Sequence, residues 1–228
     1  MKVDAVIFDM DGTLFQTDRI LEISLEDAFE RLRISELWEG ETPIEKYRQI
    51  MGVPLPKVWE ILLPIHTDEV RESVNEHFLE RLVTNIQLGK GALYPHVKQA
   101  ITHLKQQQLK LFIASNGLPS YLEAIVSHYR LDRWVDGVFS IEEIDSLHKS
   151  DLVHMICERY GVQSGAIVGD RISDIIAAKD NGLLAIGCRF DFSQEQELLQ
   201  ADVIIDDLLE LKTLFPVGDV TDTSPDCE

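Results

Sequence analysis

The sequence contains few cysteines and no long apolar run. Its three cysteines, Cys157, Cys188 and Cys227, are an odd number and lack metal-ligand spacing. We therefore expect no disulfide framework and a reducing, cytoplasmic location. No stretch approaches the roughly 18 consecutive apolar residues of a membrane-spanning helix, and a strand pattern begins directly after Lys2 instead of a secretory signal. These absences predict a protein without a membrane partner.

Positive charge is also scarce: 21 lysines and arginines stand against 40 aspartates and glutamates, for a formal net charge of −19. Such a chain repels nucleic acids and anionic membrane surfaces, so neither is an expected partner. It also repels any anionic substrate unless a cation attracts that substrate locally. A metal site, or a few well-placed lysines and arginines, is therefore the feature to look for.

The sequence does have an apolar, β-branched run that ends in two carboxylates. Residues 3–8 predict a buried strand of a parallel sheet, and Asp9, Asp11 and Gly12 follow it. From residue 95 onward, helices and strands alternate, which predicts βαβ crossovers and a doubly wound, Rossmann-like parallel sheet. Ser150 is the expected N-cap of one of these helices. The expected strands span residues 110–114, 135–141, 166–168, 184–186 and 203–205, and the expected helices residues 95–107, 118–129, 150–160 and 172–180.

Residues 17 to about 85 show no strand pattern and predict an all-helical insert. Apolar residues follow a helical spacing over residues 18–33, and Thr67 is the expected N-cap of a further helix. Prolines and glycines between residues 43 and 64 break the chain into short helical pieces. We expect an α/β core of residues 1–16 and 88–215, a helical cap of residues 17–87, and a flexible tail of residues 216–228.

Polar side chains follow four of the expected strands. Because parallel strands end at the same edge of a sheet, these residues converge where α/β sheets bind ligands. Clustered carboxylates repel one another unless a cation neutralises them, and hard oxygen ligands favour Mg²⁺. With a lysine, a hydroxyl and exposed backbone N–H groups, they describe a phosphate site. In chain order the residues are Asp9, Asp11 and Thr13; Ser115 and Asn116; Lys149; and Asp170 and Asp174.

Each piece alone has a simpler explanation. Asp11-Gly12 is a strong hairpin-turn signal, Ser115-Asn116-Gly117 is compatible with a plain loop, and Lys149 is one of many surface cations. Asp170 is compatible with a strand exit that caps a helix. All four pieces nevertheless occur in order, each after a strand, and this combination favours a site.

The four pieces together resemble the motifs of the haloacid dehalogenase-like superfamily, whose members are mostly magnesium-dependent phosphatases. The resemblance extends from Val3 to about Phe215, and residues 17–85 resemble the family's helical cap. The first motif matches Asp9-Met10-Asp11-Gly12-Thr13, the second Ser115-Asn116, the third Lys149, and the fourth Gly169-Asp170 with Asp174.

The resemblance implies a role for each matched residue. Asp9 is then the nucleophile that forms an aspartyl-phosphate, and Asp11 is the general acid and base. Mg²⁺ is held by Asp9, the backbone carbonyl of Asp11, and Asp170, while Asp174 orients the site. The residues that hold the phosphoryl group are Thr13, Ser115, Asn116 and Lys149.

Within the superfamily, the chain is most similar to phosphoglycolate phosphatase-like hydrolases, through Gly52-Val53-Pro54 and residues 197–202. It departs from them at residues 188–192, which replace a glycine-rich loop, and at Lys149-Ser150, where many carry Lys-Pro. Dehalogenases and phosphonatases lack an acid at the position of Asp11, so the acid in this chain favours phosphate ester chemistry.

The expected function is magnesium-dependent hydrolysis of small phosphomonoesters such as a phosphoglycolate-like compound, a sugar phosphate or a nucleotide. One alternative is a β-phosphoglucomutase-like sugar-phosphate mutase, although mutases usually carry Glu-Asp where this chain has Gly169-Asp170. The other is a phosphate-binding regulatory module without turnover. Arg48, Lys57 and His66 of the cap are candidates for substrate contact, with a surface role favoured for each. The oligomeric state stays open.

Overall fold

The computed structural model describes residues 3–50, 55–191 and 193–216. Contacts between Cα atoms divide the chain into two compact units. The core unit comprises Met1–Leu14, Tyr94–Asn116 and Asp132–Glu228, and the helical unit comprises Phe15–Leu93 and Gly117–Leu131. The predicted limits of core and cap stay a prediction.

The core unit is built on a sheet of six parallel strands in the order β3-β2-β1-β4-β5-β6. This arrangement confirms the predicted doubly wound α/β fold. The β1 strand is buried along its whole length because it lies between β2 and β4, where Phe8 pairs with Ile113 and Val168. The strands are β1 (Ala5–Phe8), β2 (Lys110–Ser115), β3 (Gly137–Ser140), β4 (Gly165–Gly169), β5 (Leu184–Cys188) and β6 (Val203–Ile205).

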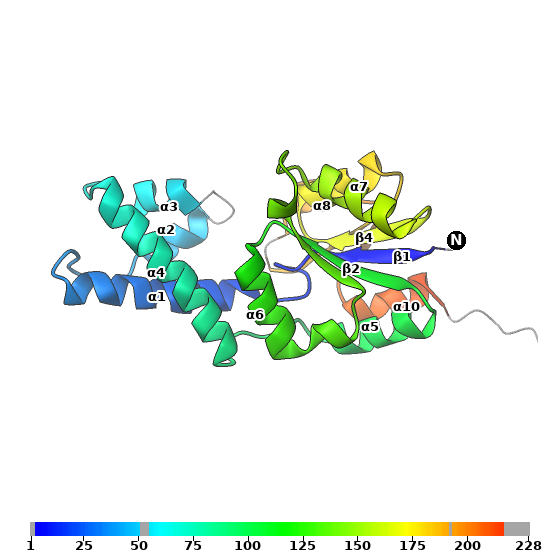
Figure 1. Ribbon diagram of the computed structural model, residues 1–228, viewed down its shortest axis with the longest axis horizontal. Helices are drawn as coiled ribbons and strands as arrows, with labels where there is room; N and C mark the ends of the chain where they lie inside the picture. The colour runs from blue at the N-terminus through cyan, green and yellow to red at the C-terminus, as the bar shows by residue number, and fades with distance from the viewer. Residues whose placement is uncertain (1–2, 51–54, 192, 217–228) are drawn as a thin grey trace, which may run out of the picture. The chain divides into compact units, whose positions relative to one another are not determined.

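Helices cover both faces of this sheet. In Figure 1, α7 and α8 lie on one side of the strands and α5 and α10 on the other. Apolar side chains from the strands and from α7 and α8 form the core cluster on one face. The helices are α5 (Val97–Gln106), α7 (Lys149–Tyr160), α8 (Ile172–Asp180), α9 (Glu195–Leu198) and α10 (Leu211–Leu214), with short 3₁₀ turns at Ile141–Glu143 and Leu208–Glu210.

The strand order reverses direction at β1 and β4. In such sheets the chain leaves β1 toward one side and β4 toward the other, which opens a crevice at their carboxyl ends where ligands bind. Asp9 directly follows β1 and Asp170 directly follows β4. The fold therefore brings the first and fourth motifs to this switch point.

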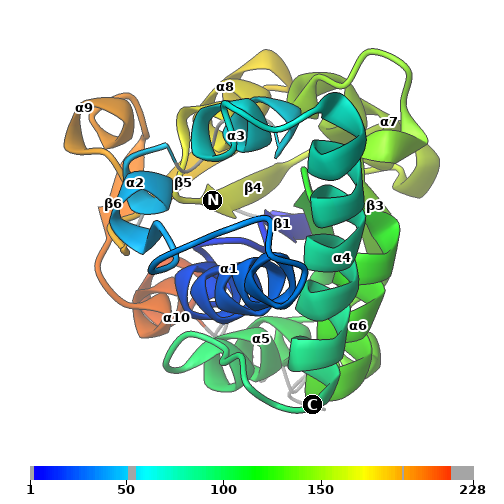
Figure 2. The same ribbon diagram turned by 90° about the vertical axis from the view of Figure 1, so that its left-hand side faces the viewer.

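The described part of the helical unit contains no strand longer than a single bridge between Phe15 and Leu93. Thr67 caps α4 as predicted, because its side chain accepts a hydrogen bond from the Val70 N–H. Figure 2 shows α6 running beside α4. The helices are α1 (Thr17–Ile34), α2 (Ile44–Gln49), α3 (Leu55–Leu62), α4 (Asp68–Gln87) and α6 (Pro119–Tyr129), followed by a 3₁₀ turn at Leu131–Arg133 that crosses into the core unit.

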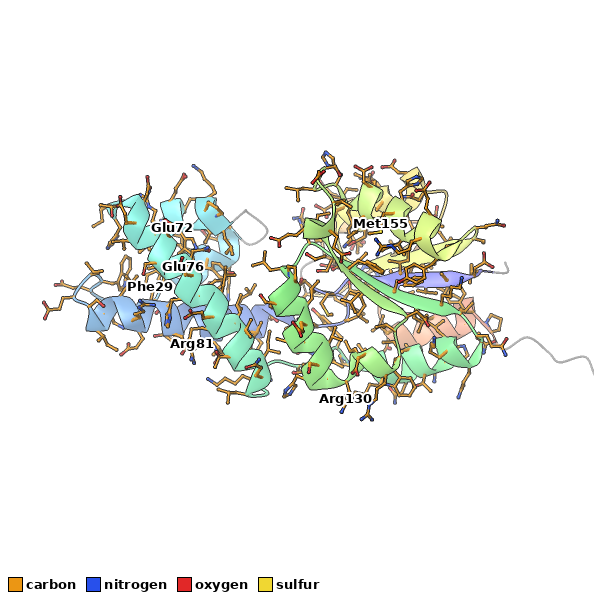
Figure 3. All side chains as sticks on the ribbon, viewed as in Figure 1. Phe29, Glu72, Glu76, Arg81, Arg130 and Met155 are labelled. Carbon is orange, nitrogen blue, oxygen red and sulfur yellow. The ribbon has the colours of Figure 1, made fainter. Side chains whose placement is uncertain are left out.

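Apolar packing and one partly buried polar network hold α1 and α4 together. Phe29 of α1, labelled with Arg81 of α4 in Figure 3, is fully buried. Arg81 pairs with Asp27 at 2.8 Å. The amide of the fully buried Asn85 donates to Ser24 and Asp27. Because the buried Asn85 amide has acceptors in Ser24 and in the half-buried Asp27, the network adds specificity to the pairing of the two helices.

Three predictions about local structure are corrected or fall outside the described residues. Helix α7 begins at Lys149 with His148 as its N-cap, so Lys149 is not in the preceding loop and Ser150 is not the cap. The Ser150 hydroxyl instead donates to Asp180 at 2.6 Å. Gly52-Val53-Pro54 and residues 217–228 of the expected tail lie outside the described residues. Among the described residues, no helix is long and apolar enough to cross a membrane.

Candidate active site

The turn after β1 is shaped by a close approach between two motifs. The Asp9 N–H donates to the Val168 carbonyl at 2.9 Å, which continues the pairing of β1 with β4. Gly12 then adopts a left-handed conformation with φ of 75°. A Cβ atom at Gly12 would lie 2.5 Å from Oδ2 of Asp170. Glycine is therefore required here for both its conformation and its lack of a side chain.

The turn after β4 presses two acidic residues against the sheet. Asp174 lies in the first turn of α8, where its Oδ2 accepts a hydrogen bond from the Arg171 N–H at 3.1 Å. A Cβ atom at Gly169 would lie 2.2 Å from Cγ of Asp174. The glycine thus lets the Asp174 carboxylate pack directly over the end of β4, beside Asp170.

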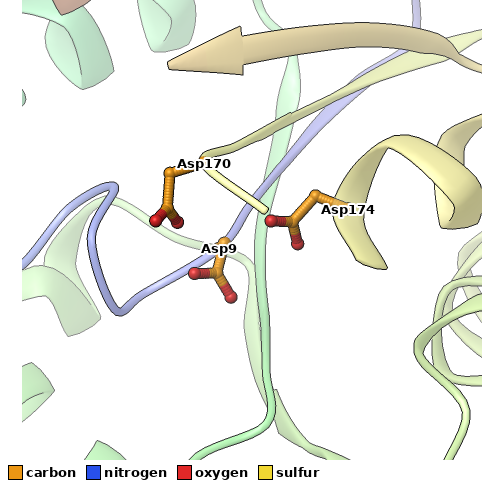
Figure 4. A group of neighbouring side chains, drawn as sticks. All are labelled: Asp9, Asp170 and Asp174. Carbon is orange, nitrogen blue, oxygen red and sulfur yellow. The ribbon is translucent and has the colours of Figure 1, made fainter. Parts of the chain in front are cut away.

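Asp9, Asp170 and Asp174 form one buried carboxylate cluster (Figure 4), with one oxygen from each lying within 4.8 Å of the others. Their exposed fractions are 6, 1 and 2%. Burial raises the pKa of Asp170 to about 7, and the charge of Asp174 adds to this shift while Lys149 opposes it. Burial likewise raises the pKa of Asp9 well above its ordinary value, against the opposing charge of Lys149. Removing like charges from water explains both shifts.

Lys149 is the buried cation of the cluster. Its ammonium forms ion pairs with Asp9 and with Asp174, the latter at 2.5 Å. Burial alone would lower the pKa of Lys149, but these two carboxylates raise it above its ordinary value. The lysine is therefore charged and held in place between the first and fourth motifs.

The charges of this cluster fit a divalent cation. Three carboxylates and one ammonium leave two negative charges when all are ionised, in a place from which water is largely excluded. Both oxygens of Asp174 are engaged, one by Lys149 and one by the Arg171 N–H. Carboxylate oxygens are the ligands that hard divalent cations prefer. The donor set thus fits a cation held mainly by Asp9 and Asp170.

Two hydroxyls lie beside the acids. The fully buried Thr13 donates to Oδ1 of Asp170 at 3.3 Å, which ties the first motif to the fourth. Ser115, at the end of β2, donates to Oδ2 of Asp11 at 3.3 Å. Asn116 follows with an exposed side chain. The structure thus brings the predicted residues of all four motifs to one edge of the sheet, while their individual roles stay predictions.

The three candidates in the cap have partners within the helical unit. Arg48 pairs with Glu22 at 2.5 Å and also with Glu45. Lys57 pairs with Glu60 at 2.6 Å, and the His66 ring lies 2.7 Å from the Leu37 carbonyl. These contacts favour the surface and structural roles over substrate binding.

Two further residues lie near the site without a role predicted from the sequence. Cys188 is fully buried at the end of β5, and burial followed by the charges of Asp170 and Asp174 raises the pKa of its thiol well above the ordinary value. Glu197 contacts the turn after β4 through Arg171 and Ile172. In the sequence, Glu197 is only a carboxylate beside an apolar residue, Leu198. This pattern does not indicate which residues it contacts.

Comparison with known proteins identifies the family. The chain is 26% identical over 200 residues to a 5'-nucleotidase of Pseudomonas aeruginosa, covering 85% of this chain and 86% of that one. It is 21% identical over 221 residues to a phosphoglycolate phosphatase of Haemophilus influenzae, covering 91 and 96%. A solved structure of a predicted phosphoglycolate phosphatase from Haemophilus somnus shares the fold, with a TM-score of 0.79, 19% identity, and coverage of 94% of this chain and 98% of that one. The sequence profile of the haloacid dehalogenase-like hydrolases matches residues 3–182, and the chain therefore belongs to this family.

Proposed function

We propose that the protein is a magnesium-dependent phosphatase that hydrolyses small phosphomonoesters through an aspartyl-phosphate on Asp9. The observation that carries this proposal is the buried cluster of Asp9, Asp170 and Lys149 at the switch point of the sheet. The names of the two relatives, a 5'-nucleotidase and a phosphoglycolate phosphatase, support phosphomonoesters as the substrate class.

Mg²⁺ would be held by the carboxylates of Asp9 and Asp170 and the backbone carbonyl of Asp11, and when bound it offsets the negative charge of the phosphoryl group. The charge count of the cluster supports a divalent cation, because Lys149 alone neutralises one carboxylate of three. Asp174 orients this arrangement, since both its oxygens are already engaged.

In the first step, a carboxylate oxygen of Asp9 forms a bond to phosphorus while the bond from phosphorus to the ester oxygen breaks. Asp11 gives its proton to the departing alcohol oxygen. Lys149 pairs with Asp9 and is placed to stabilise the charge that spreads over the phosphoryl oxygens. Ser115, Thr13 and the backbone of Asn116 hold those oxygens.

In the second step, water attacks phosphorus, Asp11 takes a proton from that water, and the bond between phosphorus and Asp9 breaks. Inorganic phosphate leaves and both acids return to their starting states. Asp11 suits this role because it is half-buried at the end of β1, whereas Asp9 is almost fully buried. The hydrogen bond from Ser115 fixes the orientation of the Asp11 carboxyl.

Hydrolysis of para-nitrophenyl phosphate tests the proposal. We expect turnover that requires Mg²⁺ and that Asp9→Asn abolishes, while Asp11→Asn binds Mg²⁺ but turns over at least ~100-fold more slowly. An unchanged rate in Asp9→Asn would exclude Asp9 as the nucleophile. Incubation with β-glucose 1-phosphate separates hydrolase from mutase: the proposal predicts free phosphate, and glucose 6-phosphate as the product would contradict it.

The physiological substrate is a small phosphorylated metabolite. A screen of phosphoglycolate, sugar phosphates and nucleoside monophosphates, with released phosphate as the readout, ranks the candidates by kcat/KM. We expect at least one of these phosphomonoesters to be hydrolysed far faster than para-nitrophenyl phosphate, because binding energy from the leaving group raises kcat/KM.

A further inference from the structure

The short segment of residues 195–202 has no part in the proposed reaction, yet it contacts the turn that carries Asp170 and Asp174. One oxygen of Glu197, Oε2, accepts two hydrogen bonds from this turn. The donors are the Ile172 N–H at 2.8 Å and Nε of Arg171 at 3.2 Å. The Glu197 side chain is only 18% exposed, so these bonds are partly shielded from water.

Glu197 is held firmly where it makes these bonds. Leu198, the next residue, is fully buried and contacts β5, because its Cδ2 lies 2.8 Å from the place where Gly187 would carry a Cβ. Asp202 fixes the other end of the segment through two bonds to Ala185: its N–H donates to the Ala185 carbonyl, and its Oδ2 accepts from the Ala185 N–H. The segment is thus anchored to β5 at two places that follow Glu197, namely Leu198 and Asp202.

The Ile172 N–H is one of the donors at the start of α8 that have no partner within the helix. The Glu197 carboxylate satisfies it, and its negative charge is favourable near a helix N-terminus. Asp174 satisfies the neighbouring Arg171 N–H from inside the helix. Two carboxylates therefore fix consecutive N–H groups of the turn, one from α8 itself and one from α9.

The hydrogen bond between the side chains of Arg171 and Glu197 also concerns Asp170. Arg171 lies next to Asp170 in the chain, and its positive charge acts on that carboxylate. Glu197 pairs with the Arg171 guanidinium and so holds this cation against α9.

We infer that Glu197 is a positioning residue for the cation site: it fixes the turn of residues 170–174 and keeps the Arg171 guanidinium from competing for Asp170. The inference rests on the proposed function only for the identity of the cation. Partners that orient metal ligands typically change metal affinity about 10–100-fold when they are removed. The role is distinct from that of a catalytic residue, because Glu197 acts through its neighbours.

The test uses the full chain and Mg²⁺ alone, titrated by calorimetry and by the shift in melting temperature. We expect Glu197→Ala to raise the Mg²⁺ Kd about 10–100-fold, and Glu197→Gln to raise it less because it keeps an acceptor for the Ile172 N–H. Glu195→Gln is the matched control, since Glu195 is on the same helix but pairs with the exposed Arg189. It is expected to bind Mg²⁺ as the wild type does.

Two further measurements separate positioning from general stability. In the metal-free protein, Glu197→Ala is expected to speed hydrogen exchange in residues 170–175 but not in β2. Adding Arg171→Ala to Glu197→Ala is expected to restore part of the Mg²⁺ affinity, because the competing cation is gone. If Glu197→Ala fails to fold, the Mg²⁺ Kd of Glu197→Gln, compared with that of the wild type, tests the inference.

Wild-type Mg²⁺ affinity in both Glu197 variants would overturn the inference. That result differs from a failure of the proposed function, which would appear as absent Mg²⁺ binding or absent phosphate release in the wild-type protein itself.

Discussion

Asp9 and Lys149 form an ion pair in which both side chains are almost completely buried, although 140 residues separate them in the chain. The pair joins the strand end that carries the proposed nucleophile to the first turn of α7. A buried pair of this kind is costly to break because the remaining charge lacks both water and a partner. It therefore ties the stability of the core unit to the geometry of the candidate active site.

Replacing Lys149 tests this link between stability and site. Lys149→Met leaves the carboxylates of Asp9 and Asp174 without their cation, so we expect the free energy of unfolding of the metal-free protein to fall by about 3–5 kcal/mol. Mg²⁺ is expected to recover part of the loss because it supplies positive charge at the same place. Urea unfolding with and without Mg²⁺ measures both effects. Lys179→Met, at an exposed position of α8, is the control, and an equal loss in both variants would contradict the account.

The raised pKa of Asp170 predicts how the stability of the metal-free protein depends on pH. The pKa is about 7 in the folded protein and 3.8 ordinarily, so the folded state binds the proton more tightly. The stabilising contribution is then complete below the ordinary pKa and is lost as the pH rises through about 7. We expect the wild type to lose stability relative to Asp170→Asn as the pH rises from about 4 to about 7, with little further loss above about pH 8. Parallel pH profiles of unfolding in the two proteins would show that Asp170 does not titrate in this range.

Gly12 allows a test of the close approach between the first and fourth motifs. Gly12→Ala puts a methyl group 2.5 Å from Oδ2 of Asp170 and also requires a left-handed conformation. Gly161→Ala requires a similar conformation, with φ of 64°, but meets no atom within 4 Å. The backbone cost of about 1–2 kcal/mol is common to both. We expect Gly12→Ala to lose more stability than Gly161→Ala and, unlike it, to weaken Mg²⁺ binding; equal effects would mean that the approach to Asp170 does not matter.

The sequence predicts the regular elements well where a repeating pattern extends over several turns or a whole strand. The helix at Ile172–Asp180 and the strand at Val203–Ile205 have the predicted limits. The N-cap of α7 was predicted two residues late, at Ser150 instead of His148, because Ser150 is a good cap by type, yet its hydroxyl pairs with Asp180. Local preference gave way to a tertiary contact.

The short helix α9 could not be predicted because its stability comes from distant residues. The four-residue α9 lacks an apolar period of its own and is fixed by the burial of Leu198 against β5. The same holds for the role of Glu197, whose partners lie 25 and 26 residues away. For the site, the motif residues were identifiable from their place after each strand. Two features of the site could be seen only in the folded structure, because they join residues far apart in the chain. These are the contacts of both Asp174 oxygens and the approach of Gly12 to Asp170.

The most direct test of the aspartyl-phosphate is the early time course of Asp11→Asn with para-nitrophenyl phosphate and Mg²⁺. The nitrophenolate leaves without needing a proton, so the first step survives, while the second step lacks its base. The account predicts a burst of about one equivalent of nitrophenol per enzyme, followed by slow turnover, and no burst when Asp9→Asn is added. A linear time course in Asp11→Asn, or a burst that persists without Asp9, would contradict it.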